Sequence, residues 1–135
     1  MSTRIAHVAV APSSVAEALR FYELVGLAVE HREEVHDQGV RVAMMPVGDS
    51  SIELLEATTP DSPVARFLQR RGPGIHHLCL EVDQLAETLH RLKAAGVRLI
   101  DESPREGAGG CRIAFVHPQS TGGVLVELSE KPDGR

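Results

Sequence analysis

The sequence contains two copies of one repeat, which together span most of the chain. Residues 5–10 (IAHVAV) match residues 75–80 (IHHLCL) at an offset of 70 residues, and this offset continues without a gap as far as Gly26 and Gly96. Further along, residues 52–54 (IEL) match residues 126–128 (VEL) at an offset of 74. A duplicated module usually closes on itself about a pseudo-twofold axis. Side chains at equivalent positions of the two copies are therefore expected to converge.

Each copy of the repeat carries one histidine and one glutamate at matching positions. His7 corresponds to His77, and Glu53 corresponds to Glu127. Apolar residues flank each of them in a predicted strand, so the polar side chain points away from the helix layer. Four polar groups on one surface cost desolvation energy, which a divalent cation bound by two imidazoles and two carboxylates offsets. The repeat therefore favours a metal site over four unrelated structural residues, with His76 as an alternative to His77 that strand parity disfavours.

The pattern of apolar and turn residues predicts the same β-α-β-β-β order in both copies. The predicted strands are residues 4–10, 28–35, 40–46 and 51–56, then 75–82, 97–101, 112–117 and 124–129, and the predicted helices are residues 15–25, 64–71 and 84–95. Ser14 and Glu17 form a capping-box signal at the start of the first helix, and Gly26 predicts its end. The Gly-rich residues 103–110 are expected to be an excursion without a counterpart in the first copy.

These elements predict an α+β fold in a single domain covering residues 1–135. Module one is expected at residues 4–57, a linker and short helix at residues 58–73, and module two at residues 74–130. The length of 135 residues is sufficient for one well-buried core.

Charge and composition limit the partners. The net charge of −5 and the pI near 5.8 argue against nucleic acid. No run of 18 apolar residues predicts a membrane span, and the N-terminus has no signal-peptide pattern, so we expect a cytoplasmic protein. The two cysteines, Cys79 and Cys111, are expected to be reduced thiols.

Two longer stretches are more specific than the repeat. They are residues 107–110 (GAGG) and residues 117–128 (HPQSTGGVLVEL). Together with shorter motifs at residues 5–10, 38–40, 53–56, 61–63 and 74–77, they make residues 4–129 similar to the vicinal oxygen chelate (glyoxalase/dioxygenase) superfamily. Within that superfamily the chain resembles the methylmalonyl-CoA epimerases.

This resemblance implies two βαβββ modules that curl into half barrels and form one metal-lined cup. It implies four metal ligands, His7, Glu53, His77 and Glu127. An N₂O₂ donor set permits Co²⁺, Mn²⁺, Ni²⁺, Fe²⁺ or Zn²⁺, and Co²⁺ is the ion we expect. The resemblance also implies a homodimer, which would suit the exposed strand edges of open sheets.

The implied reaction interconverts (2R)- and (2S)-methylmalonyl-CoA by proton transfer at C2 through a metal-chelated enolate. The resemblance assigns Glu127 as one acid/base, and Glu53 is a candidate for the other. It further implies that the acyl-CoA substrate contacts Gln38, Gly107, Gly109, Ser120 and Thr121. The glycines around Gly109 are either a flexible hairpin or a wall that the substrate approaches closely.

Two residues depart from the pattern of the family. Val42 stands where some members have a glutamate that serves as the second acid/base. Its candidate replacements are Glu53, Glu33, Glu34 and a bound water molecule.

The other departure is Gln119, which stands where the family has a lysine suited to a CoA phosphate. The backbone amides of Ser120, Thr121 and Gly122 would remain as phosphate donors.

Two other functions share this fold. One is a glyoxalase-type isomerase that acts on a glutathione adduct. The other is a non-catalytic dimer that binds a small molecule such as an antibiotic. The complete set of four ligand positions favours an enzyme, and the acyl-CoA-like segments around Gly109 and Ser120 favour the epimerase.

Overall fold

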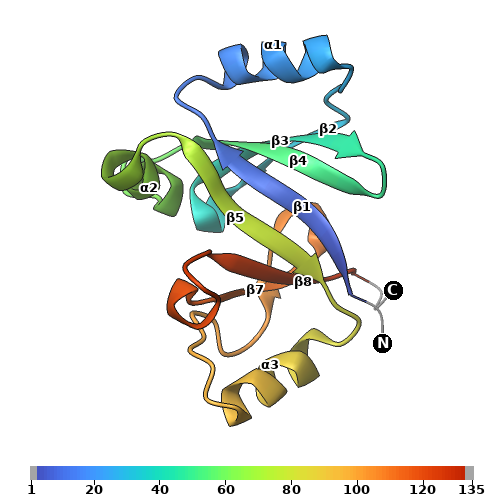
Figure 1. Ribbon diagram of the computed structural model, residues 1–135, viewed down its shortest axis with the longest axis vertical. Helices are drawn as coiled ribbons and strands as arrows, with labels where there is room; N and C mark the ends of the chain where they lie inside the picture. Colours follow the sequence, from blue (N-terminus) through green and yellow to red (C-terminus); the bar gives the residue numbers. More distant parts are fainter. Residues whose placement is uncertain (1–2, 133–135) are drawn as a thin grey trace. The chain divides into compact units, whose positions relative to one another are not determined.

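The computed structural model describes residues 3–132. Contacts within the chain divide it into two compact units, one of residues His7–His76 and one that joins Met1–Ala6 to His77–Arg135. The division passes through strands β1 (Arg4–Ala11) and β5 (Gly74–Glu81), which begin the two copies of the repeat (Figure 1). Within the described residues, no helix combines the length and the apolar character needed to cross a membrane.

Module one contains four hydrogen-bonded strands. Besides β1 it contains β2 (His31–Val35), β3 (Val40–Val47) and β4 (Ser50–Ala57), in the order β2-β3-β4-β1. Strand β1 runs parallel to β4, and the other pairs are antiparallel. A parallel pair needs a crossover connection, and helix α1 (Val15–Val25) begins it.

The predicted ends of α1 are confirmed. The Ser14 hydroxyl accepts a hydrogen bond from the backbone N–H of Glu17 at 3.2 Å. Gly26 closes the helix in the left-handed conformation at φ 115°. The sequence signals of the N-cap and the C-cap therefore set both ends of this helix.

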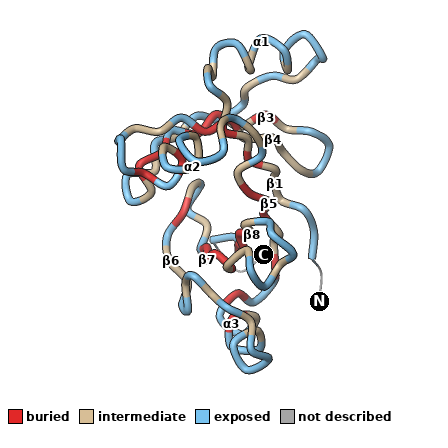
Figure 2. Tube along the Cα trace, turned by 60° about the vertical axis from the view of Figure 1, so that its left-hand side comes forward, coloured by how far each residue is buried: buried red, intermediate tan, exposed pale blue. Residues whose placement is uncertain are grey.

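The sheet of module one is covered by helices on both faces. Ala43, Met45 and Leu54 pack with apolar residues of α1 on one face. On the other face, residues of β1, β3 and β4 pack with α2 (Pro63–Arg71); the buried members of this α2-side cluster are Ala9, Ala11, Val40, Val42, Leu55 and Val64. Figure 2 shows the buried positions concentrated in these strands rather than in α1.

Module two repeats the topology with different helical cover. Its strands β5, β6 (Arg105–Glu106), β7 (Arg112–Val116) and β8 (Val126–Glu130) follow the order β5-β8-β7-β6, with β5 parallel to β8. Helix α3 (Leu85–Ala94) packs on one face of these strands. Its residues Leu85 and Leu89 form a cluster there with Val82, Ala114, Val116 and Leu128. Glu130 supports the start of α3, because its carboxylate accepts the Leu85 N–H at 2.7 Å.

Three predictions about module two were wrong. Residues 97–101 do not form a strand, because their ladder to β7 is a single bridge between Leu99 and Val116. Val124, predicted as the first residue of the last strand, precedes β8 and is 45% exposed. The glycine-rich excursion does have a counterpart, because β6, the 3₁₀ turn Ala108–Gly110 and β7 repeat β2, the 3₁₀ turn His36–Gln38 and β3. With a two-residue β6, the alternating pattern is too short to detect in the sequence.

The glycine after the 3₁₀ turn of module one is required for two separate reasons. Gly39 has φ 61°, and a Cβ there would come within 2.8 Å of Thr59 Oγ1 and 2.9 Å of Ser62 Cβ. Gly48 has nearly the same angle, φ 59°, but a Cβ there would have no heavy atom within 4 Å. The two positions therefore separate backbone strain from steric crowding.

We expect Gly39→Ala to destabilise the protein more than Gly48→Ala does. Backbone strain alone should cost about 1 kcal/mol of unfolding free energy at Gly48. Crowding against the linker should add about 1–3 kcal/mol at Gly39. Urea unfolding of both variants tests this, and equal losses would contradict the packing of the linker on this turn.

Candidate functional site

His77 and Glu127 lie side by side on module two. Their strands β5 and β8 pair in parallel, and His77 Nε2 lies 3.0 Å from Glu127 Oε1. Both side chains are more than nine-tenths buried. Their neighbours Leu80, Val126 and Leu128 belong to the cluster around α3, so the two polar side chains face away from that helix. The orientation predicted from strand parity is confirmed.

His7 and Glu53 form the equivalent pair on module one. They lie on β1 and β4, and His7 Nδ1 is 3.2 Å from Glu53 Oε2. Their side chains are 14% and 13% exposed. The flanking Ile52 and Leu54 pack on the α1 side, so this pair also faces away from α1 as predicted.

Each pair has the chemistry and spacing of two neighbouring metal ligands. Imidazole nitrogen and carboxylate oxygen both bind divalent ions such as Zn²⁺ at about 2.1 Å. Two such bonds at a right angle place the ligand atoms roughly 3 Å apart. The nitrogen–oxygen distances of 3.2 Å and 3.0 Å match this spacing. Each pair therefore fits a divalent ion without a change of strand geometry.

The ring of Phe115 supports the His77 pair. Phe115 pairs in register with Glu127, and its ring meets His77 edge-on with 5.5 Å between centroids. The Phe115 N–H donates to Asp101 at 2.8 Å, and the other Asp101 oxygen accepts from Arg105 Nε at 3.1 Å. The Arg105 guanidinium lies over the Phe115 ring at 5.7 Å. These three supporting residues could not be identified from the sequence, because they are not part of the matched motifs.

The alternative histidine lies on the other face of β5. His76 precedes His77, so its side chain alternates to the opposite side, and its ring meets Phe67 of α2 at 5.0 Å. His76 therefore has a packing role, and strand parity separated the two histidines correctly.

Both cysteines are thiols rather than a disulfide pair, as predicted. Cys79 is fully buried, pairs in register with Glu127 and donates to the Ser129 hydroxyl at 3.4 Å. It thus belongs to the same strand face as His77. Cys111 follows the glycine-rich turn and is half-buried.

The predicted substrate contacts in the 3₁₀ turns have different surroundings. Gly107 is buried, and a Cβ there would lie 2.8 Å from the Ile113 side chain, so packing explains this glycine. Gly109 is exposed, has φ 69° and would meet no atom within 4 Å. Gln38 is half-buried in the turn of module one. Of the glycines in the turn, Gly109 has the open surroundings that a substrate wall requires.

The loop after β7 uses its polar groups internally. The N–H groups of Ser120 and Thr121 donate to His117 and Pro118 carbonyls at 3.0 and 3.1 Å. The Ser120 hydroxyl accepts from the Arg98 N–H at 2.9 Å, and the Thr121 hydroxyl donates to the Val124 carbonyl. Both residues organise the loop, and a contact of their amides with a phosphate stays a prediction.

Gln119, the departure from the family pattern, contacts a cation. Its side-chain oxygen accepts a hydrogen bond from Arg98 Nη1 at 2.6 Å. The positive charge beside this loop therefore comes from Arg98, which lies 21 positions earlier in the chain.

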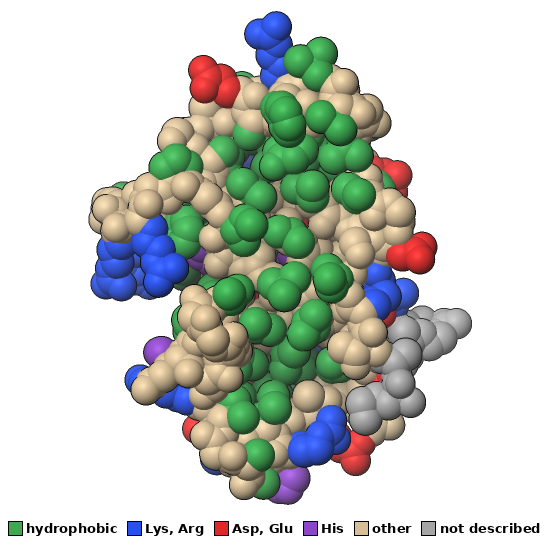
Figure 3. All heavy atoms as spheres, viewed as in Figure 1, with side chains coloured by type: hydrophobic (Ala, Val, Ile, Leu, Met, Phe, Trp, Pro, Cys, Tyr) green, Lys and Arg blue, Asp and Glu red, His purple; other side chains and the backbone are tan. Residues whose placement is uncertain are grey.

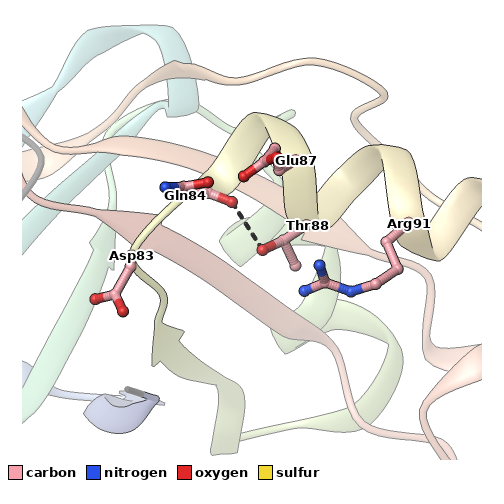
Figure 4. A pocket seen from close by; sticks show the side chains of 5 residues that line it. All are labelled: Asp83, Gln84, Glu87, Thr88 and Arg91. Atoms are coloured by element: carbon pink, nitrogen blue, oxygen red, sulfur yellow. Dashed lines mark hydrogen bonds between the residues drawn. The ribbon is translucent and has the colours of Figure 1, made fainter. Parts of the chain in front are cut away.

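A surface pocket of about 250 Å³ lies elsewhere on module two, at the start of α3 (Figure 4). It is lined by Asp83, Gln84, Glu87, Thr88 and Arg91, none of which belongs to the predicted site. The Thr88 hydroxyl donates to the Gln84 carbonyl at 2.8 Å, the bond drawn in Figure 4. The pocket therefore shares no lining residue with the two His–Glu pairs.

Comparison with known proteins identifies the family. Residues 6–115 match the family model of the Glyoxalase/Bleomycin resistance protein/Dioxygenase superfamily. The chain belongs to this superfamily and has its α+β fold of two βαβββ modules, as the sequence motifs predicted.

Individual relatives are similar over nearly the whole chain. The uncharacterized protein YqjC of Bacillus subtilis (strain 168) is 45% identical, with 94% of this chain and 91% of YqjC covered. The mitochondrial methylmalonyl-CoA epimerase of Homo sapiens is 37% identical, with coverage of 94% and 73%. A solved structure of a variant Streptomyces coelicolor methylmalonyl-CoA epimerase, in complex with 2-nitronate-propionyl-CoA, has a TM-score of 0.89 at 35% identity, with coverage of 97% and 96%.

The position of Val42 leads to a stability prediction. Val42 is 5% exposed and belongs to the α2-side cluster. A carboxylate introduced there would be desolvated, so Val42→Glu should lower the unfolding free energy by about 2–4 kcal/mol.

The control is Val47→Glu, at the exposed end of the same strand. It should change the unfolding free energy by less than about 0.5 kcal/mol. Urea unfolding at pH 7.5 measures both variants. A Val42→Glu variant as stable as the control would contradict the packing of α2 on this part of β3.

Proposed function

We propose that this protein is a metal-dependent methylmalonyl-CoA epimerase that interconverts the (2R) and (2S) forms of its substrate. The observation that carries the proposal is the matched pair of His–Glu contacts, one in each copy of the repeat. Epimerases of this substrate are among the relatives that cover most of the chain. Their similarity supports the reaction, and the two pairs supply the chemistry.

The proposed metal ligands are His7, Glu53, His77 and Glu127, which together hold one divalent ion. When bound, the ion supplies Lewis-acid stabilisation of the negative charge that develops on the substrate oxygens as C2 loses its proton. Co²⁺ is the ion we propose, because two nitrogens and two oxygens suit the later first-row metals without requiring thiolate.

Glu127 is the proposed acid/base on one face of C2. Its carboxylate is buried beside His77, and the Phe115 ring restricts the movement of that histidine. Proton transfer requires a carboxylate in a fixed position within hydrogen-bond reach of the carbon. The contacts within module two supply the fixed position, and the role of Glu53 as the second group stays a prediction.

The compound in the Streptomyces coelicolor complex, 2-nitronate-propionyl-CoA, is consistent with this chemistry. A nitronate carbon is planar and shares its negative charge with adjacent oxygens, as C2 does after it loses a proton. A glyoxalase-type isomerase and an antibiotic-binding dimer remain the competing functions of this fold. Activity on methylmalonyl-CoA distinguishes the epimerase from a glyoxalase-type isomerase. The metal content of the purified protein distinguishes it from an antibiotic-binding dimer.

The predicted homodimer has a candidate contact surface on α1. Phe21, Leu24 and Val25 are 61%, 77% and 64% exposed, and Figure 3 shows apolar side chains at the surface in this region. The equivalent residues of α3, at the offset of 70, are Arg91, Ala94 and Ala95. The fold itself therefore does not require large apolar groups here, and a second copy of the chain would cover them.

A charge on this surface should separate the subunits. We expect Leu24→Glu to shift the protein from dimer to monomer in light scattering coupled to size-exclusion chromatography. Ala94→Glu, the same change at the equivalent position of α3, should leave the dimer intact. A wild-type monomer, or a Leu24→Glu dimer, would contradict the assignment.

Hydrogen exchange at C2 tests the proposed reaction directly. In D₂O, metal-stripped protein should exchange the C2 proton of methylmalonyl-CoA no faster than the enzyme-free reaction does. Addition of Co²⁺ should restore the faster loss of the C2 proton signal. Proton NMR follows the signal. Glu127→Ala should reduce both Co²⁺ affinity and exchange, because one residue serves both purposes.

The opposite results exclude the proposal. If no divalent ion produces exchange above the enzyme-free rate, the chain is not an epimerase of this substrate. If Glu127→Ala exchanges at nearly the normal rate, another residue is the acid/base.

A further inference from the structure

Inversion at C2 requires a second acid/base. A proton removed from one face of a planar carbon must return from the opposite face, so a group on one side alone gives exchange with retention. Glu127 comes from module two, and the repeat predicts that its partner comes from module one. The sequence leaves Glu53, Glu33 and Glu34 as candidates there.

Glu34 lies on the wrong face of its strand. It pairs in register with Arg41, which is exposed, and its carboxylate contacts Arg41 at 3.7 Å and His36 at 3.4 Å. Residues of a strand alternate between faces, so Glu34 points away from the face that carries Glu53. This carboxylate belongs to a surface ion-pair group.

Glu33 lies on the same face as the His7–Glu53 pair. It pairs in register with Val42 of β3, which pairs with Leu55 of β4. Leu55 is two residues from Glu53 and therefore shares its face. Directly opposed side chains of antiparallel strands have Cβ atoms about 5 Å apart, so Glu33 and Val42 are neighbours on this face.

The surroundings of Glu33 suit proton transfer. Its carboxylate is 2.9 Å from His31 Nε2, and the two side chains are 30% and 50% exposed. Glu33 is thus partly shielded, and the imidazole beside it connects the carboxylate to solvent protons. Glu53, in contrast, is only 13% exposed beside His7, so its carboxylate has less direct contact with solvent protons than that of Glu33.

The second copy of the repeat shows that this position has become specialised. Glu53 pairs with Met44, two residues after Val42, and Glu127 pairs with Phe115, two residues after Ile113. The β6 residue that pairs with Ile113 is Arg105. The position of Glu33 is therefore occupied by a cation in module two, and module one alone offers a carboxylate there.

We propose that Glu33 is the second acid/base of the epimerisation, with His31 as its proton relay; this assignment rests on the proposed function. In one direction the Glu33 carboxylate takes the C2 proton, the C–H electron pair enters the enolate, and the carboxylic acid of Glu127 returns a proton to the opposite face. In the other direction the two groups exchange roles. Afterwards His31 transfers the proton of Glu33 to solvent, and Glu127 takes a proton from solvent, which restores both groups.

The test compares exchange with inversion in Glu33→Gln. Each epimer of methylmalonyl-CoA is incubated separately with Co²⁺-loaded protein in D₂O. NMR measures deuterium at C2, and chromatography of the two diastereomers measures inversion. We expect inversion to fall at least about 100-fold, because a positioned acid/base contributes about 10²–10⁴ in rate. The epimer that presents its hydrogen to Glu127 should still exchange within about tenfold of the wild-type rate.

Glu34→Gln is the matched control, since it makes the same change one residue later on the opposite face. It should exchange and invert within about twofold of wild type. Co²⁺ affinity, measured by calorimetry, should be unchanged in both variants, which separates proton transfer from metal binding.

Three outcomes would overturn the inference. One is wild-type inversion in Glu33→Gln, and another is an equal loss of exchange in both epimers with Co²⁺ affinity intact. The third is a wild-type protein that neither exchanges nor inverts, which removes the proposed function itself. The first two leave the proposed function standing, so the failures are distinguishable.

Discussion

The hydrogen-bond contact between an imidazole and a carboxylate on neighbouring parallel strands is the constraint around which each module is arranged. In module two, His77 and Glu127 are buried at 3.0 Å from each other, and a carboxylate in such a place is costly unless it is paired. The pair holds β5 and β8 in a register that directs Leu80 and Leu128 to α3. The same strand register therefore sets both the packing of α3 and the orientation of the face that carries His77 and Glu127.

Module one repeats this arrangement with a more open pair and a second helical layer. Helix α2 packs on the side of the sheet that carries Ala9 and Leu55, the face of His7 and Glu53. Apolar cover close to a polar pair limits access of water, which strengthens electrostatic interactions at that surface. In module two, the corresponding role next to His77 belongs to the Phe115 ring and the Asp101–Arg105 ion pair.

Much of this arrangement could be predicted from the sequence, because periodicity and caps are local signals. The ends of α1, the face of each metal-ligand candidate and the separation of His76 from His77 follow from strand and helix periods alone. The short strand β6 could not be predicted, because two residues do not establish alternation.

The contacts within the loop around Ser120 could not be predicted for a different reason. A sequence shows which amides exist but not which of them already donate within a turn. The roles of Asp101 and Arg105 depend on contacts to Phe115 from 14 and 10 residues away, for which the repeat carries no signal. The single domain predicted for residues 1–135 stays a prediction beside the two compact contact units.

The opposite charges of Glu33 and Arg105 at equivalent register positions have a consequence for the ancestry of the fold. An ancestor built from two identical modules would carry the same residue twice at this position, two carboxylates or two guanidinium groups. Divergence after gene duplication gave each half its own charge, so neither half can now be replaced by a second copy of the other without making the protein symmetric again.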